Sequence, residues 1–478
     1  MRRGNDLARV SNWTAMLCDS DARWNPGHPG AAGRPSPPTT RPSRVPPDLP
    51  MPTSTPTDRQ RLFEETLAQA SQAFDLPLPA MPPRGQAAPT GPDADCMLLR
   101  GDNLRWLSSL LATRCPGFDF CYIDPPYNTG QQFVYSDAFK SSDERAPWGR
   151  HAGWLRFMLP RLAAAHALLE RHGIMAISID DRACAPLKVL MDAIFGEANC
   201  IATLVVVRSR NGKGSRPHVA INHEYVLLYG RSDAARVSGL HEADATSYDK
   251  VDAHGRYKVD GLFRKKGDAS LRSDRPNLHY PLWYASSGEV YTTEVRAGLG
   301  VAWPVDSKGV ERRWLWGRDK AAEESWKLLA SPGGVVYVKN YAAADKRVKL
   351  RSVLDSSAYL TDRATTETKA IFGEKIFETP KPIALVRDLA DACCANPAAR
   401  VLDFFAGSGT TAESVQELNA RDGGRRTTVL VEQDAAIPDG HVAARLGHRS
   451  IADITTARLE HVKRRFPSFT FAQSSLPS

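Results

Sequence analysis

Short apolar runs alternate with segments of helical periodicity along most of this chain, and this alternation constrains the fold more than any other feature of the sequence. The pattern begins at residue 97. Its apolar runs lie at 118–123, 174–179, 203–207 and 224–228, and its helical segments lie at 154–169 and 187–195. Apolar runs of this length between helices are typical of buried parallel strands. The first block of the chain therefore predicts an α/β sheet.

The alternation stops near residue 235 and resumes at Pro380. In this second block we expect a helix over 383–393, a strand over 400–405, a helix after Gly409 and a strand over 427–432. Two blocks with the same alternation predict one Rossmann-like, doubly wound α/β sheet that has helices on both faces.

Composition divides the remaining residues. Pro, Gly, Ser, Thr and Arg dominate residues 25–57, and such a stretch buries too little apolar surface to offset its ordering entropy, so we expect disorder there. Thr57 and Gln60 form a capping box that predicts a helix start. Between the two blocks periodicity is lost, which predicts an inserted α+β domain. The predicted segments are a leader over 1–57, a helical segment over 58–96, the halves of the main domain over 97–234 and 361–470, the insert over 235–360 and a tail over 471–478.

The first predicted strand ends in Ile123-Asp124-Pro125-Pro126-Tyr127, which suits the binding of an aromatic amine. Such an amine is a poor nucleophile because its lone pair is delocalised into the ring. The Asp124 carboxylate and the Pro125 carbonyl can accept its N–H groups, and the two prolines add no competing N–H donor. Tyr127 offers a flat face on which an extruded base can stack. The plainer interpretation is an acid that merely ends a strand before a Pro-Pro turn.

The second block contains a turn of the form Gly407-Ser408-Gly409 between a strand and a helix. Such a turn lets the backbone approach a nucleotide-like ligand. Glu432 ends the next strand, 23 residues after Gly409, and can accept hydrogen bonds from both hydroxyls of a ribose. A dinucleotide site would have a third glycine where Ala412 stands. With Asp403 ahead of the turn, the pattern favours a site for a methyl donor.

Together these motifs resemble the amino-group DNA methyltransferases, and their order resembles the permuted β-class arrangement, in which the target motif precedes the cofactor loop. More closely, the chain resembles the modification (Mod) subunit of type III restriction–modification systems over about residues 97–465. Besides the cofactor loop, the segments that carry this resemblance are 99–103, 122–130, 222–227, 274–278, 377–382 and 451–455.

The resemblance implies a methyltransferase that moves a methyl group from S-adenosylmethionine to the N6 amino group of adenine in double-stranded DNA, after flipping the base out. It implies that residues 235–360 recognise the target sequence. The implied catalytic residues are Asp124, Pro125, Pro126 and Tyr127. The implied cofactor residues are Asp102, Asp124, Tyr127, Lys381 near the methionine end, Asp403, Phe405, Gly407, Gly409, and Glu432 on the ribose.

Three alternatives stay open at this point. The same fold could methylate the N4 amino group of cytosine, although Asp rather than Ser at position 124 favours adenine by resemblance. RNA is a more distant substrate, and a non-catalytic binding module on the same scaffold is the alternative from another class. The partners that the resemblance implies are double-stranded DNA, a second copy of the chain in a homodimer and a restriction subunit, although a solitary enzyme is equally open.

The charge of the chain permits a polyanionic partner. The sequence has 62 basic and 54 acidic residues, a net charge of +8, although many soluble proteins are mildly basic. One loop concentrates basic side chains that could contact DNA phosphates or simply be solvated; they are Arg208, Arg210, Lys213 and Arg216. Most of the large aromatic residues of the insert are expected in its core; they are Trp283, Tyr284, Trp303, Trp314 and Trp316.

Targeting and redox features are sparse. We find no apolar run of about 18 residues and no apolar stretch at the N-terminus, so we expect a cytoplasmic protein with no membrane span. The eight cysteines form no C-x-x-C pair, and several lie in apolar segments. This spacing predicts reduced thiols and no structural metal site.

Overall fold

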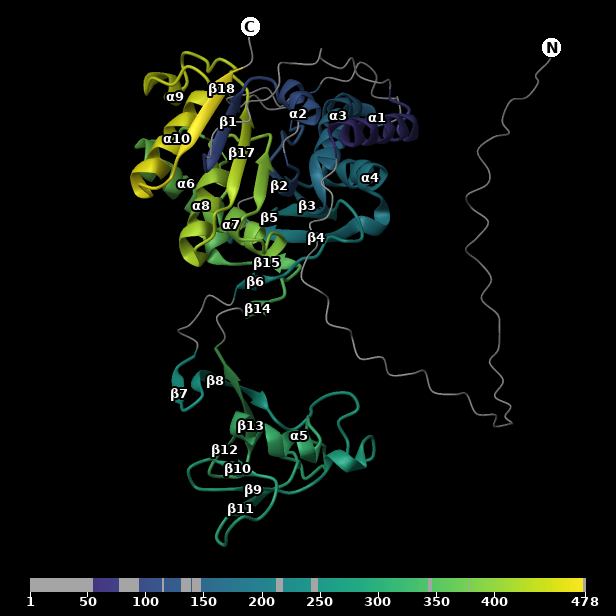
Figure 1. The fold of residues 1–478 in the computed structure, drawn as a ribbon, viewed down its shortest axis with the longest axis vertical. Helices are drawn as coiled ribbons and strands as arrows, with labels where there is room; N and C mark the ends of the chain where they lie inside the picture. The colour runs from purple at the N-terminus through teal and green to yellow at the C-terminus, as the bar shows by residue number, and fades with distance from the viewer. Residues whose placement is uncertain are drawn as a thin grey trace, which may run out of the picture. The chain divides into compact units, whose positions relative to one another are not determined.

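A nine-stranded sheet organises the main part of the computed structural model, which describes residues 55–76, 94–113, 116–129, 139, 148–211, 218–241, 248–342, 346–377 and 379–475 (Figure 1). Its strand order is β15-β4-β5-β3-β2-β16-β17-β1-β18. The strands are β1 Cys96–Arg100, β2 Phe118–Ile123, β3 Leu169–Ile179, β4 Cys200–Val207, β5 His223–Gly230, β15 Val353–Leu354, β16 Arg400–Asp403, β17 Thr427–Glu432 and β18 Phe471–Ser475. All neighbours are parallel except β5, which runs antiparallel to β3 and β4.

The two blocks of the sequence meet in the middle of this sheet. Strand β2 of the first block pairs with β16 of the second, with Phe120 opposite Val401 and Cys121 opposite Leu402. From this pair the sheet continues to β3 on one side and to β17 on the other, so the winding reverses here. In open α/β sheets, ligands bind outside the carboxyl ends of strands at such a reversal.

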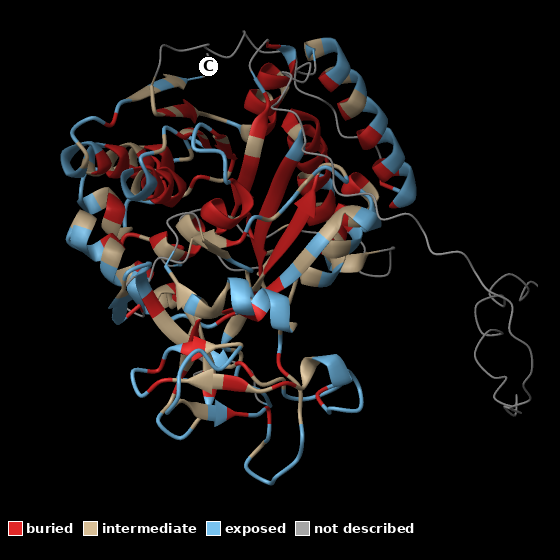
Figure 2. Ribbon diagram, turned by 60° about the horizontal axis from the view of Figure 1, so that its bottom comes forward, coloured by how far each residue is buried: buried red, intermediate tan, exposed pale blue. Residues whose placement is uncertain are grey.

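Helices cover both faces, which confirms the doubly wound arrangement. On one face lie α1 Pro56–Ala73, α2 Asn103–Ala112, α3 Ala152–Leu168 and α4 Cys184–Phe195; on the other lie α7 Ile383–Cys393, α8 Thr410–Asp422 and α10 Ile451–Arg465. Strand β2 sends Cys121 and Ile123 into the first core and Phe120 and Tyr122 into the second. Because its side chains are buried on both sides, the sequence of this strand is largely apolar. Figure 2 shows that strands in the middle of the sheet are mostly buried.

Helix α1 begins two residues before the predicted start. The Thr55 hydroxyl accepts the Asp58 N–H at 3.2 Å, and the Asp58 carboxylate accepts the Thr55 N–H at 3.2 Å. Pro56 favours this start because its fixed φ suits the first helical position, where no N–H is required. The capping box predicted at Thr57 and Gln60 is therefore wrong. Of the predicted leader, residues 1–54 lie outside the described residues.

The insert contains two small antiparallel sheets. One has the order β12-β13-β8-β7 and the other β10-β9-β11. The elements are β7 Lys250–Asp252, β8 Gly255–Leu262, β9 Leu282–Tyr284, β10 Val290–Tyr291, β11 Gly300–Ala302, α5 Arg318–Glu323, β12 Leu328–Ala330 and β13 Val336–Tyr341. As predicted, Trp314 lies in the core of this region and Trp316 packs against it. Trp303 does not, because its side chain is 46% exposed.

Several boundaries differ from those expected. Strand β15 falls within 235–360 but pairs with β4 of the main sheet, and β18 falls within the predicted tail but pairs with β1. The chain leaves and rejoins the main domain through the paired strands β6 Leu240–His241 and β14 Arg347–Val348. The remaining helices are α6 Thr361–Phe372 and α9 Val442–Arg445. No helix among the described residues has the length and apolar character needed to cross a membrane.

Candidate active site

A pocket opens at the carboxyl edge of the sheet, where β2, β16 and β17 end. Its empty volume is about 1110 Å³, open solvent included. The predicted residues that line it are Asp102, Asp124, Pro126, Lys381, Asp403, Phe405, Gly407 and Glu432. Pro125, Tyr127 and Gly409, which are also described, are not part of its wall. The two motifs of the sequence, separated by some 280 residues, thus face one cavity because their strands are neighbours.

The glycine turn takes a backbone conformation that side chains disfavour. Gly407 has φ 54° and Gly409 has φ 82°, and Gly409 caps α8. The Thr455 hydroxyl of α10 donates to the Gly407 carbonyl at 2.7 Å. A Cβ on Gly409 would lie 3.2 Å from the Thr455 methyl group, a tight contact. Both glycines are therefore required by the turn itself, and Gly407 also leaves the pocket wall bare.

The side chain of Asp403 binds residues on both sides of this turn. One oxygen of its carboxylate accepts the Phe405 N–H at 3.0 Å, and the other accepts the Thr411 hydroxyl at 2.5 Å. Burial raises the pKa of Asp403 to about 7, despite these two hydrogen bonds. Near neutral pH, this carboxyl group therefore exchanges between its neutral and charged forms.

Glu432 joins the end of β17 to the same turn. Its Oε2 accepts the Gly407 N–H at 2.6 Å, and its Oε1 accepts the Gln433 N–H at 3.0 Å. The residue is 8% exposed, and burial raises its pKa to about 8. A cationic group bound in the pocket would favour the charged form and lower this pKa.

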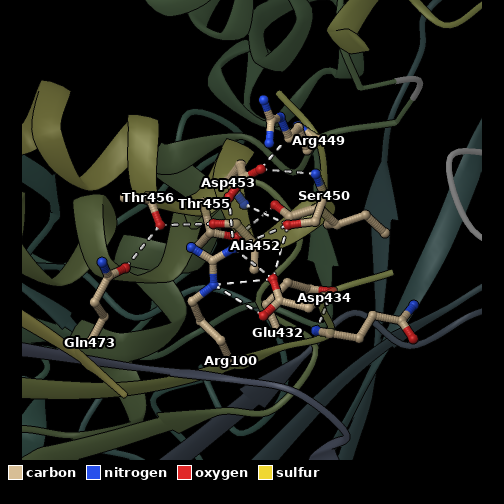
Figure 3. A network of polar contacts seen from close by, with 12 residues as sticks. Arg100, Glu432, Asp434, Arg449, Ser450, Ala452, Asp453, Thr455, Thr456 and Gln473 are labelled. Atoms are coloured by element: carbon tan, nitrogen blue, oxygen red, sulfur yellow. Dashed lines mark hydrogen bonds and ion pairs between the residues drawn. The ribbon is translucent and has the colours of Figure 1, made fainter. Parts of the chain in front are cut away.

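An ion-pair network close to Glu432 links the end of β1 to Asp434 and to the start of α10 (Figure 3). Arg100, the last residue of β1, contacts Asp434 at 2.6 Å and Asp453 at 2.6 Å. Asp453 also accepts the Ser450 N–H at 3.0 Å and so caps α10, which carries Thr455. The network therefore positions the helix that supports the glycine turn. Arg100 and Asp453 lie in the matching segments 99–103 and 451–455, but neither was assigned a role from the sequence.

Asp102 lines the pocket, although it also has a structural task. It caps α2 by accepting the Arg105 N–H at 2.9 Å, and its other oxygen lies 3.2 Å from Arg161. Arg161 donates to the Asn103 side chain at 2.6 Å, and Asn103 donates to the Phe404 carbonyl at 2.8 Å. Burial lowers the pKa of Arg161 to about 10, so it remains a cation at neutral pH. Sequence reasoning missed this cation inside the pocket.

The target motif forms a separate cluster at the other side of the pocket. The Tyr127 hydroxyl donates to Asp124 Oδ1 at 2.7 Å. Lys381 Nζ lies 3.0 Å from the same Oδ1, 2.7 Å from the Tyr127 hydroxyl and 3.2 Å from Glu224 Oε2. The Trp154 indole donates to the Pro126 carbonyl at 2.7 Å and so fixes the Pro-Pro turn. Glu224 was part of a matching segment but was assigned no role from the sequence.

Only half of the predicted basic loop can be placed. Arg208 follows β4, which runs parallel to β3, so it leaves the sheet at the same edge as Asp124. Arg210 is exposed, and its guanidinium donates to the Asp355 carbonyl at 3.4 Å. Lys213 and Arg216 lie outside the described residues.

The pocket chemistry fits S-adenosylmethionine, which carries a sulfonium, an ammonium, a carboxylate and a planar base. Carboxylates outnumber cations in the lining, and phenylalanine rings complete it; these residues are Asp102, Asp124, Asp403 and Glu432, then Arg161 and Lys381, then Phe139, Phe157, Phe377 and Phe405. The carboxylates suit the two cationic groups, the Arg161 cation suits the carboxylate, and aromatic faces suit the base.

Comparisons with known proteins identify the family of this chain. The profile of a family described as DNA methylase matches residues 118–437. The type II methyltransferase M.KpnI of Klebsiella pneumoniae is 51% identical over 372 residues, 78% of this chain and 88% of that protein. The type III restriction–modification enzyme EcoPI Mod subunit of Escherichia phage P1 is 33% identical over 402 residues, 77% of this chain but only 62% of that protein. The resemblance seen in the motifs is confirmed: this chain belongs to the DNA methylase family.

Proposed function

We propose that this protein transfers a methyl group from S-adenosylmethionine to the N6 amino group of adenine in double-stranded DNA. The observation that carries the proposal is that Asp124 and the Gly407 turn line one pocket, at the ends of neighbouring strands. The first is an acceptor suited to an aromatic amine, and the second is a turn suited to a nucleotide-like ligand. Membership of the DNA methylase family supports the reaction class.

The Asp124 cluster supplies what the amine requires. Asp124 Oδ1 is engaged by Tyr127 and Lys381, whereas Oδ2 has no hydrogen-bond partner within the described residues. Oδ2 and the Pro125 carbonyl can accept the two N–H groups of the amine and so favour a tetrahedral nitrogen with an available lone pair. Alignment of that lone pair with the donor is the main gain, since positioning and fixed dipoles carry most of such a rate enhancement.

The cofactor residues occupy the rest of the pocket. When bound, S-adenosylmethionine supplies an electrophilic methyl group. Glu432 would hold the ribose hydroxyls, Phe405 would pack on a planar ring, and Asp102 would face a cationic group. Gly407 would let the backbone come close. Each of these residues lines the pocket, which supports the assignment.

For DNA binding, we propose that the insert recognises the target sequence and that Arg208 and Arg210 contact phosphates. The position of Arg208 at the same edge of the sheet as Asp124 supports this. Homodimer formation and association with a restriction subunit stay predictions. Light scattering of the purified chain, alone and with a 30-base-pair duplex, would test the dimer.

The direct test is nucleoside analysis by mass spectrometry. Unmethylated DNA is incubated with the protein and S-adenosylmethionine, digested to nucleosides and compared with a reaction that contains the Asp124→Ala variant. We expect N6-methyladenine only in the wild-type reaction. N4-methylcytosine in its place would contradict the assigned base. Intact cofactor binding with no methylated nucleoside from any DNA would favour the non-catalytic binding module.

A further inference from the structure

The ammonium group of Lys381 lies among three protein oxygens, donates hydrogen bonds to two of them and forms an ion pair with the third. Nζ lies 2.7 Å from the Tyr127 hydroxyl, 3.0 Å from Asp124 Oδ1 and 3.2 Å from Glu224 Oε2. An ammonium group has three donors. A cofactor carboxylate at this ammonium group would have to compete with these three protein oxygens. The contacts therefore associate Lys381 with the target motif rather than with the methionine end of the cofactor.

The charge of this cluster keeps Lys381 cationic. Its side chain is 8% exposed, and burial alone would lower its pKa. The neighbouring carboxylates of Asp124 and Glu224 outweigh burial and raise the pKa above its usual value. A permanent cation can hold a carboxylate oxygen in a fixed position, because a charged hydrogen bond is about twice as strong as a neutral one.

Glu224 is the second anchor of Lys381. It lies near the start of β5, the one antiparallel strand of the central sheet, and so reaches the same edge as the ends of β2 and β3. Its side chain is 7% exposed, and burial raises its pKa because the charged form is less well solvated there. Lys381, and more weakly Arg208, favour its ionised form. A buried carboxylate that contributed nothing would be costly to keep.

We propose that Lys381 and Glu224 are positioning residues for methyl transfer. The Glu224–Lys381 pair holds Oδ1 of Asp124 and the hydroxyl of Tyr127, which fixes the rotation of the Asp124 carboxylate and leaves Oδ2 facing the amine of the target base. This inference rests on the proposed function. It differs from the role implied by family resemblance, in which Lys381 binds the cofactor.

The test separates cofactor affinity from the rate of transfer. The full chain is compared with Lys381→Met, which keeps the length of the side chain but removes its charge. Single-turnover methylation of a DNA duplex is measured at saturating S-adenosylmethionine, and the dissociation constant of the cofactor is measured by calorimetry. We expect the rate to fall about 100-fold, as a small displacement of a reacting group can cause. The dissociation constant should stay within about threefold of wild type, because the positioning role leaves the cofactor contacts intact.

Two further variants make the result specific. Lys381→Arg restores a cation and should recover part of the rate, which a merely structural defect would not do. Glu224→Gln keeps the shape but loses the charge that holds Lys381, and should lower the rate about tenfold. Lys375→Met, at an exposed lysine six residues earlier, is the matched control and should behave as wild type.

The opposite pattern would overturn the inference. A cofactor dissociation constant raised more than 30-fold, with an unchanged rate at saturation, would return Lys381 to the cofactor site. Should Lys381→Met fail to fold, Glu224→Gln decides the matter, and a rate above half of wild type would reject the positioning role. A wild-type protein that methylates no DNA would instead refute the proposed function, which keeps the two failures distinct.

Discussion

The two sides of the pocket hold their carboxylates in different ways. On the side of the glycine turn, Asp403 and Glu432 accept backbone N–H and hydroxyl groups, and burial raises their pKa values to about 7 and about 8. On the side of the target motif, Asp124 and Glu224 are held by the cation of Lys381. Without a bound ligand, the carboxyl groups of the first side can take up protons and become neutral. On the second side, the ammonium group of Lys381 favours the charged form of the carboxylates. Asp403 and Glu432 thus bind the backbone of the turn, and their charge can change when a ligand binds. Asp124 and Glu224 are instead fixed in position by an ion pair with Lys381.

Asp124→Ala should have the largest effect, because it removes the carboxylate that accepts the amine of the target base and that the Glu224–Lys381 pair positions. We expect transfer to fall by about 1000-fold, the upper range for loss of one preorganised polar group. Cofactor affinity should change little, since the glycine turn stays intact. Tritium transfer to unmethylated DNA and calorimetry measure the two quantities. Activity above a tenth of wild type would contradict the role of Asp124 as the acceptor for the amine on the side of the target motif.

Gly407→Trp should act on the opposite side. The indole would extend from the bare wall of the pocket at a backbone position with φ 54°, so we expect cofactor affinity to fall by more than about 100-fold. Gly440→Trp is the matched control, because a Cβ there meets nothing within 4 Å. Calorimetry with S-adenosylmethionine checks both variants. Unchanged affinity in Gly407→Trp would remove the turn from the binding site.

Glu432 should make cofactor binding depend on pH. The pKa of Glu432 is about 8 and that of Asp403 is about 7, so both carboxyl groups become protonated as the pH falls from 8.5 to 6. A neutral carboxyl group attracts a cationic ligand less strongly than a carboxylate does. We expect affinity to weaken about tenfold between pH 8.5 and 6. Glu432→Gln should flatten this dependence. Calorimetry over that pH range tests it, and an equal slope in wild type and variant would argue against Glu432 as the titrating group.

The smallest effect concerns the stability of the ligand-free protein. Because the folded pKa values of Asp403 and Glu432 are raised, the folded state binds more protons than the unfolded state between about pH 4.5 and 8. Its free energy of unfolding should therefore decrease as pH rises from 6 to 8.5. Urea denaturation at both pH values measures the change. Asp403→Asn should reduce it, whereas a stability that increased with pH through this range would contradict the raised pKa values.

The sequence predicted those parts of the molecule that local pattern determines. The run 118–123 is β2 without any change of bounds, and the predicted residues Asp124, Asp403, Gly407 and Glu432 line one pocket because each follows or ends a parallel strand. Apolar periodicity reports burial, and strand ends in a parallel sheet meet at one edge.

Pairings between distant segments could not be predicted in this way. Nothing in the period of 224–228 shows that β5 runs antiparallel, so the approach of Glu224 to Lys381 was unforeseen. For the same reason β18 was not predicted, because its partner β1 lies more than 350 residues earlier in the sequence. The start of α1 was missed for a local reason, since two overlapping capping patterns exist and Pro56 favours the earlier one.

The short pairing of β6 with β14 has a consequence for how such enzymes change their targets. His241 lies opposite Arg347, and Leu240 lies opposite Val348, so the two segments that join the insert to the rest of the chain adjoin each other in a separate two-stranded sheet. Arg347 and the His241 N–H both bind the buried carboxylate of Asp391 on α7. Another domain could therefore replace the insert at this junction without altering a strand of the main sheet. With the proposed role of the insert in target recognition, a new methylation site would then require only a domain whose two ends meet.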